Sequence, residues 1–467
     1  MTSPAPDPTD APVVAAGPLG RLRALRIWQA MDVRDFRLLW ASEGVSVLGD
    51  QFHAVALSWL VISLTGSGLA LGTVLIAISV PRALLLLPMG VVADRRSPRS
   101  LMLFSHLARA AIVAAITVLV VSGNASIPAL AALGVLFGCA DAVFLPTMEA
   151  FLPRAVGPDR LPSANALLQA TLQLVSIVGP PVAGVVVAAA GTGIAFGVDA
   201  ASFVIAAGLI ALIAGAGSLA MATAAPDPAS APRAAPATVS ESGATARPAP
   251  AQTPAEPFIA SLRGGVRYVL KDQSIGVMLA VSLVLNFALN GPAAVGMPWL
   301  AQLRFHAGAA GLGLLAAGWA VGGLAGTVIA GSARLERQGR VLLLAIAVSG
   351  LAMAGVGLAG SLVVAFLLFA IAGLCIGYVN IVAISWLQAR VELAMLGRVM
   401  SLVMLVSFGI SPLSMALAGV LIDLNATALF VGAGTLVVLA TLVALALGTV
   451  EMFDAPRPAG DAALAKQ

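Results

Sequence analysis

Two long apolar runs are separated by the stretch Gly90-Val-Val-Ala-Asp94-Arg95-Arg96-Ser97-Pro98-Arg99. Its last six residues hold four formal charges, although only 10% of the whole chain is charged. This density of charge between apolar runs predicts a tight cytoplasmic loop that joins the second and third of a series of membrane helices. The side on which this loop lies fixes the side of every other loop, because successive helices cross the membrane in opposite directions.

Composition indicates a polytopic membrane protein. Hydrophobic residues make up 60% of the 467-residue chain, and its charged fraction is less than half of the roughly 25% usual for a soluble domain. The 48 glycines suit close packing between helices in lipid. The two cysteines, Cys139 and Cys375, both fall inside apolar runs and show no metal-ligand spacing. We therefore expect neither a disulfide framework nor a metal site.

Twelve segments are apolar enough to cross a membrane, since a spanning helix needs about 20 apolar residues. They cover approximately residues 37–64, 68–92, 100–122, 127–152, 163–190, 193–217, 274–300, 308–331, 340–360, 362–388, 395–421 and 425–450. The chain is thus predicted to be an all-α integral membrane protein with twelve transmembrane helices.

Basic residues set the predicted orientation, because Lys and Arg are enriched in cytoplasmic loops. Nearly all of the 25 Lys and Arg fall in the two tails, in the segment between the sixth and seventh helices, or in loops of the same parity as 90–99. Arg304 lies in a loop of the other parity, and Arg82 and Arg109 lie within helices. Both termini are therefore expected in the cytoplasm, and the protein in the inner (plasma) membrane of the cell.

The spans divide the chain into five predicted parts. These are a cytoplasmic tail (1–36), a six-helix half (37–217), a linker (218–272), a second six-helix half (273–450) and a second cytoplasmic tail (451–467). The linker is rich in Ala and Pro and ends in an amphipathic stretch that we expect to lie on the membrane surface. The alternative is a helix docked on another domain.

The two halves resemble each other in sequence. Glu336-Arg-Gln-Gly-Arg340 echoes the charged loop 94–98, and Gly409-Ile-Ser-Pro412 stands where the first half has Gly179-Pro180-Pro181. Two such halves indicate a parallel internal repeat with a binding site between them, near the middle of the membrane.

These motifs resemble the major facilitator superfamily. Its signature G-x-L-A-D-R-x-G-R-R is matched at Gly90, Asp94, Arg95 and Arg99, whereas Ser97 and Pro98 replace a Gly and a basic residue. The segments 35–40 (DFRLLW) and 397–401 (GRVMS) are similar to an exporter branch that includes enterobactin-type siderophore exporters and macrolide efflux pumps.

The resemblance implies the major facilitator fold and a secondary active transporter. It would export a small amphipathic organic molecule, such as a drug, a macrolide, a siderophore or another secondary metabolite, and would be driven by a proton gradient without a cofactor. Gly179-Pro180-Pro181 with Gly184 is similar to the fifth-helix motif of drug/proton antiporters. That likeness implies a kink that seals the outer end, while a packing kink without a gating role is the alternative.

Charges at membrane depth are candidates for proton coupling, because they are costly to bury. Glu43 and Asp50 are seven residues apart and share a helix face. Asp50 is the leading candidate proton carrier, Glu43 and Asp141 are alternates, and Arg82 or Arg109 would be the partner that shifts the pKa. For Arg82, Arg109 and Asp141, a static ion pair that locks helices together is an equally good interpretation.

The second half offers polar but uncharged candidates for binding the substrate: Asn286, Asn290, Tyr378 and Asn380. Hydrogen bonds between helices are the alternative role for each. At the charged loop, Asp94 is expected to pair with Arg398 and to latch the two halves together, in a gate that also includes Gly90, Arg95 and Arg99.

Other functions stay open at this stage. A facilitator or importer of a neutral small solute, or a membrane sensor that does not transport, would fit the same fold. No phosphate-binding loop, nucleophile elbow or metal-ligand cluster supports an enzyme. The expected partners are a small-molecule substrate, protons and the lipid bilayer, without nucleic acid, and we expect a monomer.

Overall fold

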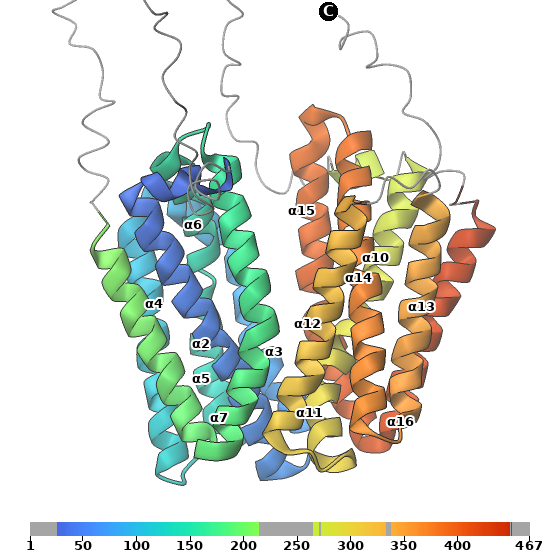
Figure 1. The fold of residues 1–467 in the computed structure, drawn as a ribbon, viewed down its shortest axis with the longest axis horizontal. Helices are drawn as coiled ribbons and strands as arrows, with labels where there is room; N and C mark the ends of the chain where they lie inside the picture. Colours follow the sequence, from blue (N-terminus) through green and yellow to red (C-terminus); the bar gives the residue numbers. More distant parts are fainter. Residues whose placement is uncertain (1–25, 214–264, 270–271, 333–337, 449, 451–467) are drawn as a thin grey trace, which may run out of the picture.

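A computed structural model describes residues 26–213, 265–269, 272–332, 338–448 and 450. This part of the chain consists of helices in two groups that stand side by side (Figure 1). The first group contains η1 (Arg26–Asp32), α2 (Arg34–Thr65), α3 (Gly68–Arg95), α4 (Pro98–Val121), α5 (Ile127–Asp141), α6 (Phe144–Val156) and α7 (Leu161–Ala211). The second contains α10 (Gln273–Gly291), η3 (Pro292–Gly296), α11 (Met297–Trp299), η4 (Leu300–Arg304), α12 (Gly308–Ser332), α13 (Gln338–Leu358), α14 (Leu362–Arg390), α15 (Leu393–Gly409) and α16 (Ser411–Ala446).

Ten helical segments of the described residues are long and apolar enough to cross a membrane. Two of them contain a residue with a non-helical backbone: Gly191 in α7 (φ 82°, ψ 168°) and Asn425 in α16 (φ −163°, ψ 104°). The left-handed φ of Gly191 is one that glycine adopts without strain. A straight helix of the 51 residues of α7 would measure about 75 Å, against a hydrocarbon core of about 30 Å. Each of these two segments is therefore two helices in succession.

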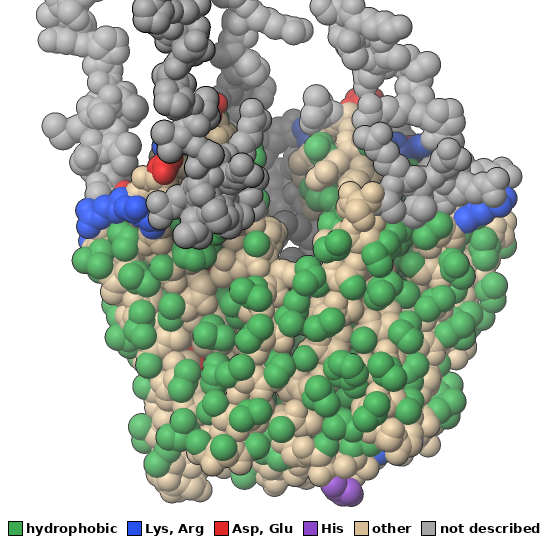
Figure 2. Space-filling model, in the orientation of Figure 1, with side chains coloured by type: hydrophobic (Ala, Val, Ile, Leu, Met, Phe, Trp, Pro, Cys, Tyr) green, Lys and Arg blue, Asp and Glu red, His purple; other side chains and the backbone are tan. Residues whose placement is uncertain are grey.

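The outer surface fits a lipid environment. Hydrophobic side chains cover the sides of both groups, and Arg side chains gather near one end (Figure 2). Many of the exposed side chains are large and apolar, for example Leu84, Val121 and Leu424, which are 70%, 75% and 77% exposed. Water would penalise such exposure, whereas lipid chains would not.

The two groups touch closely near the end at which α3 begins, which we call the tied end. A Cβ atom added at Gly184 of α7 would lie 2.6 Å from the carbonyl oxygen of Ala309 in α12. One added at Gly419 of α16 would lie 2.8 Å from the carbonyl oxygen of Gly68 in α3. Only glycine therefore lets these backbones approach so closely. At the opposite end, where α3 ends, the groups stand apart (Figure 1); we call it the open end.

A carboxylate also joins the groups at the tied end. Asp423 of α16 accepts hydrogen bonds from the Ser67 hydroxyl (2.6 Å) and from the backbone N–H groups of Gly68 (2.6 Å) and Leu69 (3.0 Å). These N–H groups belong to the first turn of α3, which has no partners within its own helix and carries the positive end of the helix dipole. The charge of Asp423 thus strengthens a contact that runs across the two groups.

Replacing this carboxylate should loosen the tied end. In Asp423→Ala, three hydrogen bonds are lost, and we expect spin labels at Asn124 and Gly360, which lie in loops of the two groups, to show a larger population at longer distance by pulsed electron paramagnetic resonance. A loss of about 1–3 kcal/mol corresponds to a shift in that population of about 5-fold to 150-fold. Ser67→Ala removes a single bond and should shift it less. A distance distribution identical to that of the wild type would contradict this role of Asp423.

The described part of the predicted amphipathic helix contacts the second group. Residues 265–269 are helical, and Val269 is buried in a cluster with Leu387 and Val399. A Cβ atom added at Gly265 would lie 3.0 Å from the carbonyl oxygen of Arg398 in α15. The other residues of this segment, apart from Asp272, lie outside the described part of the chain, so its location on a membrane surface stays a prediction.

α10 begins at an aspartate that is held by the neighbouring helix. Asp272 accepts hydrogen bonds from the backbone N–H groups of Ser274 (2.9 Å) and Ile275 (3.4 Å), and Arg390 Nε at the end of α14 lies 3.1 Å from its Oδ2. Partial burial raises the pKa of Asp272, but Arg390 and the two N–H groups outweigh that effect and hold the pKa below its ordinary value of 3.8. The cap and the pair therefore stabilise the folded protein above about pH 4, and this stabilisation is lost as the pH falls below it.

We expect Asp272→Ala to lower the free energy of unfolding by about 1–2 kcal/mol, because it removes both a helix cap and a partly exposed pair. Asp272→Asn keeps an oxygen that can accept from the N–H groups and should lose less. Thermal unfolding in detergent measures both. The difference between wild type and Asp272→Asn should shrink as the pH falls through the lowered pKa; a difference that grows on acidification would contradict the assignment.

Candidate functional site

A cavity of about 560 Å³ lies between the two groups of helices. Its first-group wall comes from α2 and α7, and its second-group wall from α10, η3, α11, α12, α14 and α16. The polar side chains that line it are Gln51, Gln173, Ser176, Asn290, Thr327 and Asn380. Trp319, Met297 and several alanines and glycines provide most of the remaining surface. None of the described lining residues carries a formal charge. A cavity of this size suits a drug-sized molecule.

Two of the four residues predicted to bind substrate line this cavity, namely Asn290 and Asn380. Asn286 lies one turn from Asn290 and accepts a hydrogen bond from its Nδ2 (3.3 Å), while its own Nδ2 donates to the carbonyl of Ser282 (2.8 Å). It therefore positions Asn290 from behind. Tyr378 precedes Asn380 by two residues, which is about 200° around the helix, and is buried in the hydrophobic core instead.

The sequence analysis missed Gln51 and Gln173, which form the polar part of the first-group wall. It concentrated on formal charges, whereas both of these side chains are neutral amides within long apolar runs. Their signal was the position of Gln51 directly after Asp50, and of Gln173 in the helix that carries Gly179-Pro180-Pro181. An uncharged amide at membrane depth also needs hydrogen-bonding partners, so it deserves the same scrutiny as a charge.

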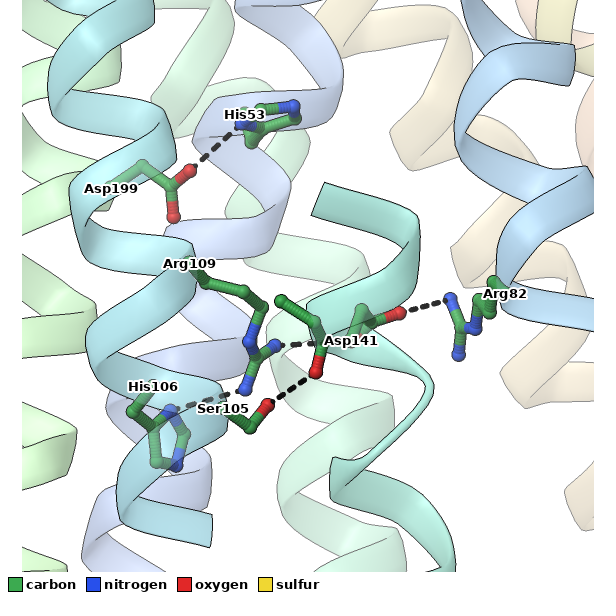
Figure 3. A network of polar contacts seen from close by, with 8 residues as sticks. His53, Arg82, Ser105, His106, Arg109, Asp141 and Asp199 are labelled. Carbon is green, nitrogen blue, oxygen red and sulfur yellow. Dashed lines mark hydrogen bonds and ion pairs between the residues drawn. The ribbon is translucent and has the colours of Figure 1, made fainter. Parts of the chain in front are cut away.

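Three of the predicted intramembrane charges of the first group, Arg82, Arg109 and Asp141, form one network (Figure 3). Asp141, at the end of α5, lies between two arginines: its Oδ2 is 3.0 Å from Arg82 Nη1 of α3, and its Oδ1 is 3.2 Å from Arg109 Nη1 of α4. The helix is interrupted after Asp141 and resumes at Phe144 as α6. The break places the carboxylate where both arginines reach it.

Arg109 is held in an almost closed pocket. It is 2% exposed, its Nη2 lies 3.1 Å from His106 Nδ1, and its guanidinium carbon lies 4.4 Å from the centre of the Phe203 ring. A cation over an aromatic face is favourable, particularly where water is excluded. Arg82, in contrast, has 47% of its side chain exposed. The two arginines that bind Asp141 thus differ sharply in their surroundings.

A second polar pair lies nearer the tied end. The Nδ1 atom of His53, in α2, lies 2.9 Å from the Oδ2 atom of Asp199, in α7. The His53 ring stacks on the Phe137 ring, with 4.8 Å between the ring centres. Asp199 is completely buried. This pair joins α2 to α7 within the first group.

Glu43 and Asp50, the two leading carboxylates of the first predicted helix, occupy different environments. Glu43 is buried, and no described residue hydrogen-bonds to its Oε2. Asp50 is half-buried, forms no ion pair with a described side chain, and lies within electrostatic range of Arg109, Asp199, Asp141 and Glu43. Neither lines the cavity, but Gln51, the neighbour of Asp50, does.

The gating candidates divide between the two ends. Pro180 and Gly184 face α12 at the tied end: a Cβ on Gly313 would overlap the Pro180 carbonyl. Arg99, at the open end, hydrogen-bonds to the carbonyl oxygens of Ile210 and Ala211 within its own group. A Cβ added at Gly90 would meet no described atom within 4 Å.

The remaining gating residues do not test the predicted latch. The side chain of Asp94 lies outside the described part of the structure. Arg95 is exposed, and Arg398 Nη1 lies 3.9 Å from Met395 Sδ. Gly179 packs against Gln51: a Cβ atom added at Gly179 would overlap the Cβ and Cγ atoms of Gln51.

The network makes a prediction about stability. Asp141→Asn removes the carboxylate that is ion-paired with the buried Arg109, and we expect the free energy of unfolding to fall by about 3–5 kcal/mol. Arg82→Gln removes a half-exposed partner and should cost about 1 kcal/mol or less. Asp141→Asn combined with Arg109→Gln should recover part of the loss. Thermal unfolding of the purified protein tests all three, and an unchanged melting temperature in Asp141→Asn would contradict the structural role.

Comparison with known proteins identifies the family. The model of the Major Facilitator Superfamily matches residues 39–413. The chain belongs to the major facilitator superfamily. Like other members of this superfamily of membrane transporters, it is not an enzyme, and its predicted class of non-enzymatic, multi-pass transporter is confirmed.

One relative in sequence and two solved structures are similar to this chain over most of its length. The chain is 28% identical over 429 residues to an uncharacterized MFS-type transporter, y4rN, of Sinorhizobium fredii, an alignment that covers 88% of this chain and 94% of that protein. The structure is similar to that of the nucleoside transporter NupG (TM-score 0.63, 13% identity, 90% of this chain and 100% of that one). It is also similar to a bacterial homologue of the iron transporter ferroportin (TM-score 0.64, 16% identity, 91% and 99%).

Proposed function

We propose that this protein is a secondary active transporter that exports a small amphipathic organic molecule in exchange for protons. The observation that supports it most is the cavity between two groups of helices that are tied at one end, beside a network of ionisable residues in one group. A binding site between two halves that rock about it is what alternating access requires.

The proposal includes twelve spans and a cytoplasmic open end. Counting α7 and α16 as two helices each turns the ten candidate segments into twelve, six in each group. Arginines at helix ends lie almost entirely at the open end, for example Arg95, Arg160 and Arg390, whereas Arg304 lies at the tied end. By the positive-inside rule the open end is cytoplasmic. The conformation described is then the one that faces the cytoplasm, from which an exporter takes its substrate.

The opposite conformation would close the open end and separate the tied end. A Cβ added at Gly90 meets no atom of the described residues within 4 Å in the present conformation, and the approaching α15 would pack there. Asp94 could then pair with Arg398, as the sequence predicts. Asp423 would hold the conformation described here, and Asp94 would hold the opposite one. Both contacts join α3 to the helix that consists of α15 and the first part of α16, one contact at each end.

Proton coupling is assigned to the carboxylates of the first group. Burial favours the protonated form of a carboxylate, and a nearby arginine favours the ionised form. A rocking motion that changes the distance from Asp50 or Glu43 to Arg109 would bind a proton on one side of the membrane and release it on the other. Asp50 is favoured because no described side chain pairs with it. Asp141 is better suited to fixing the arginines.

Asp50→Asn should abolish accumulation driven by a pH gradient while leaving binding intact, because an amide cannot carry the proton. Everted membrane vesicles energised by acidification of the lumen measure the accumulation of radiolabelled chloramphenicol and erythromycin. Asp159→Asn changes an exposed carboxylate in a loop and is the matched control. Undiminished gradient-driven accumulation in a well-expressed Asp50→Asn protein would rule out Asp50 as the carrier.

A facilitator for a neutral solute is the second candidate, favoured by the uncharged lining of the cavity. The same vesicles separate the two. A facilitator equilibrates its solute whether or not the pH gradient is present, whereas an antiporter accumulates it only while the gradient lasts.

A further inference from the structure

We infer that the cavity binds a substrate without formal charge, which presents hydrogen-bond donors and acceptors to both halves and a flat ring to Trp319. This inference rests on the proposed transport function and specifies its substrate class. It follows from the hydrogen-bonding state of the side chains that line the cavity.

Three amides in the cavity have no partner among the described residues. Gln51 and Gln173 lie on the first-group wall and Asn380 on the second-group wall, and no described group hydrogen-bonds to the side chain of any of them. Each offers two N–H donors and a carbonyl acceptor. The site thus presents unused donors and acceptors from opposite sides. A ligand that both donates and accepts satisfies them, as amides and hydroxyl groups do.

The other polar side chains are partly committed. The Ser176 hydroxyl donates to the backbone carbonyl of Gln173 (2.8 Å), and the Thr327 hydroxyl donates to the backbone carbonyl of Gly323 (2.9 Å). Asn290 donates one N–H to Asn286. These groups retain acceptor capacity, so the cavity as a whole balances donors and acceptors.

Part of the second-group wall is backbone, where α12 and α14 pack tightly against each other. A Cβ added at Gly373 would overlap the carbonyl of Trp319, and one added at Gly377 would overlap that of Gly323, so α12 and α14 meet backbone to backbone. The ring of Trp319 is fixed edge-to-face against Phe369, 6.4 Å between centres. A smooth wall with one aromatic ring suits a planar group stacked upon it.

A charged substrate would be poorly stabilised here. During transport the cavity must close around its contents, which removes water from them, and an ion without a counter-ion then pays a large desolvation penalty. The formal charges of the first group are outside the lining, and Asp141 is already shared by Arg82 and Arg109. Neutral amides can take the place of the water around a polar ligand, but they do not supply the counter-charge that an ion needs.

A neutral substrate has an electrical consequence. Exchange of one proton for one neutral molecule moves one positive charge across the membrane in each cycle. Both the membrane potential and the pH gradient would therefore drive export. One elementary charge across 100 mV is equivalent to about a 50-fold accumulation. Exchange of a proton for a singly charged cation moves no net charge and would ignore the potential.

Binding to the purified full-length protein tests the substrate class with three molecules that share a nitrophenyl ring. Chloramphenicol is neutral and carries an amide and two hydroxyls, its deacylated amine base carries an ammonium group, and its hemisuccinate carries a carboxylate. Isothermal titration should show chloramphenicol binding at least ten-fold more tightly than either charged molecule. Equal or tighter binding of a charged molecule, or no binding of any of the three, would overturn the inference.

Variants locate the binding in the cavity. Gln51→Leu, Gln173→Leu and Asn380→Leu should each weaken chloramphenicol binding by about three- to ten-fold, as expected for one lost hydrogen bond. Gln169→Leu changes an exposed glutamine of the same helix outside the lining and should not. Gln173→Glu adds a charge at nearly constant shape and should shift the preference toward the amine base. Binding unaffected by the three cavity variants would also overturn the inference.

Reconstituted vesicles separate this inference from the proposed function. Chloramphenicol transport is measured with a pH gradient at zero potential, and with a potassium diffusion potential at equal pH. Transport driven by both forces is expected. Gradient-driven accumulation of the amine base without accumulation of chloramphenicol would refute the neutral substrate and leave proton antiport standing. Binding without response to either force would refute proton antiport and leave the cavity's preference for neutral ligands standing.

Discussion

The carboxylate of Asp423 on the first turn of α3 is the contact on which the rest of the arrangement depends. It joins a helix of the second group to one of the first, next to glycines at which the two backbones touch. Because these contacts are confined to one end, the groups diverge from there, and the cavity lies in the space between them. A short, directional, charge-assisted bond is well suited to this role, since it is strong when formed and is lost over a small displacement.

The layout of the helices follows from the sequence because apolar runs of about 20 residues and the alternation of arginines are local signals. The network around Asp141 was also within reach, since intramembrane charges seek partners. The contact of Asp423 was not, because it joins residues more than 350 positions apart and its donors are backbone groups, which no residue type reveals. Tyr378 shows a different limit: helical spacing places it away from Asn380, but only the packing of α14 shows which of the two faces is the cavity.

Charge and binding occupy different places in this protein. Arg82, Arg109, Asp141 and Glu43 belong to the first group, whereas the cavity between the groups is lined by neutral side chains. The two regions meet on α2, where Asp50 and Gln51 are consecutive. A proton and a substrate would then influence each other through the position of one helix and not by competing for the same atoms, so a neutral compound can be coupled to a proton without contacting it.

The glycines of α12 and α14 constrain how this transporter can change over evolutionary time. Any side chain at Gly373 or Gly377 forces two helices apart, so that wall is closed to gradual variation. On the other side, Gln173 faces the cavity, whereas the Cβ and Cγ of Gln51 pack against Gly179, so that Gln51 can change freely only beyond its Cγ. New specificities in descendants of this protein should therefore arise on the first-group wall, while the second-group wall is inherited nearly unchanged.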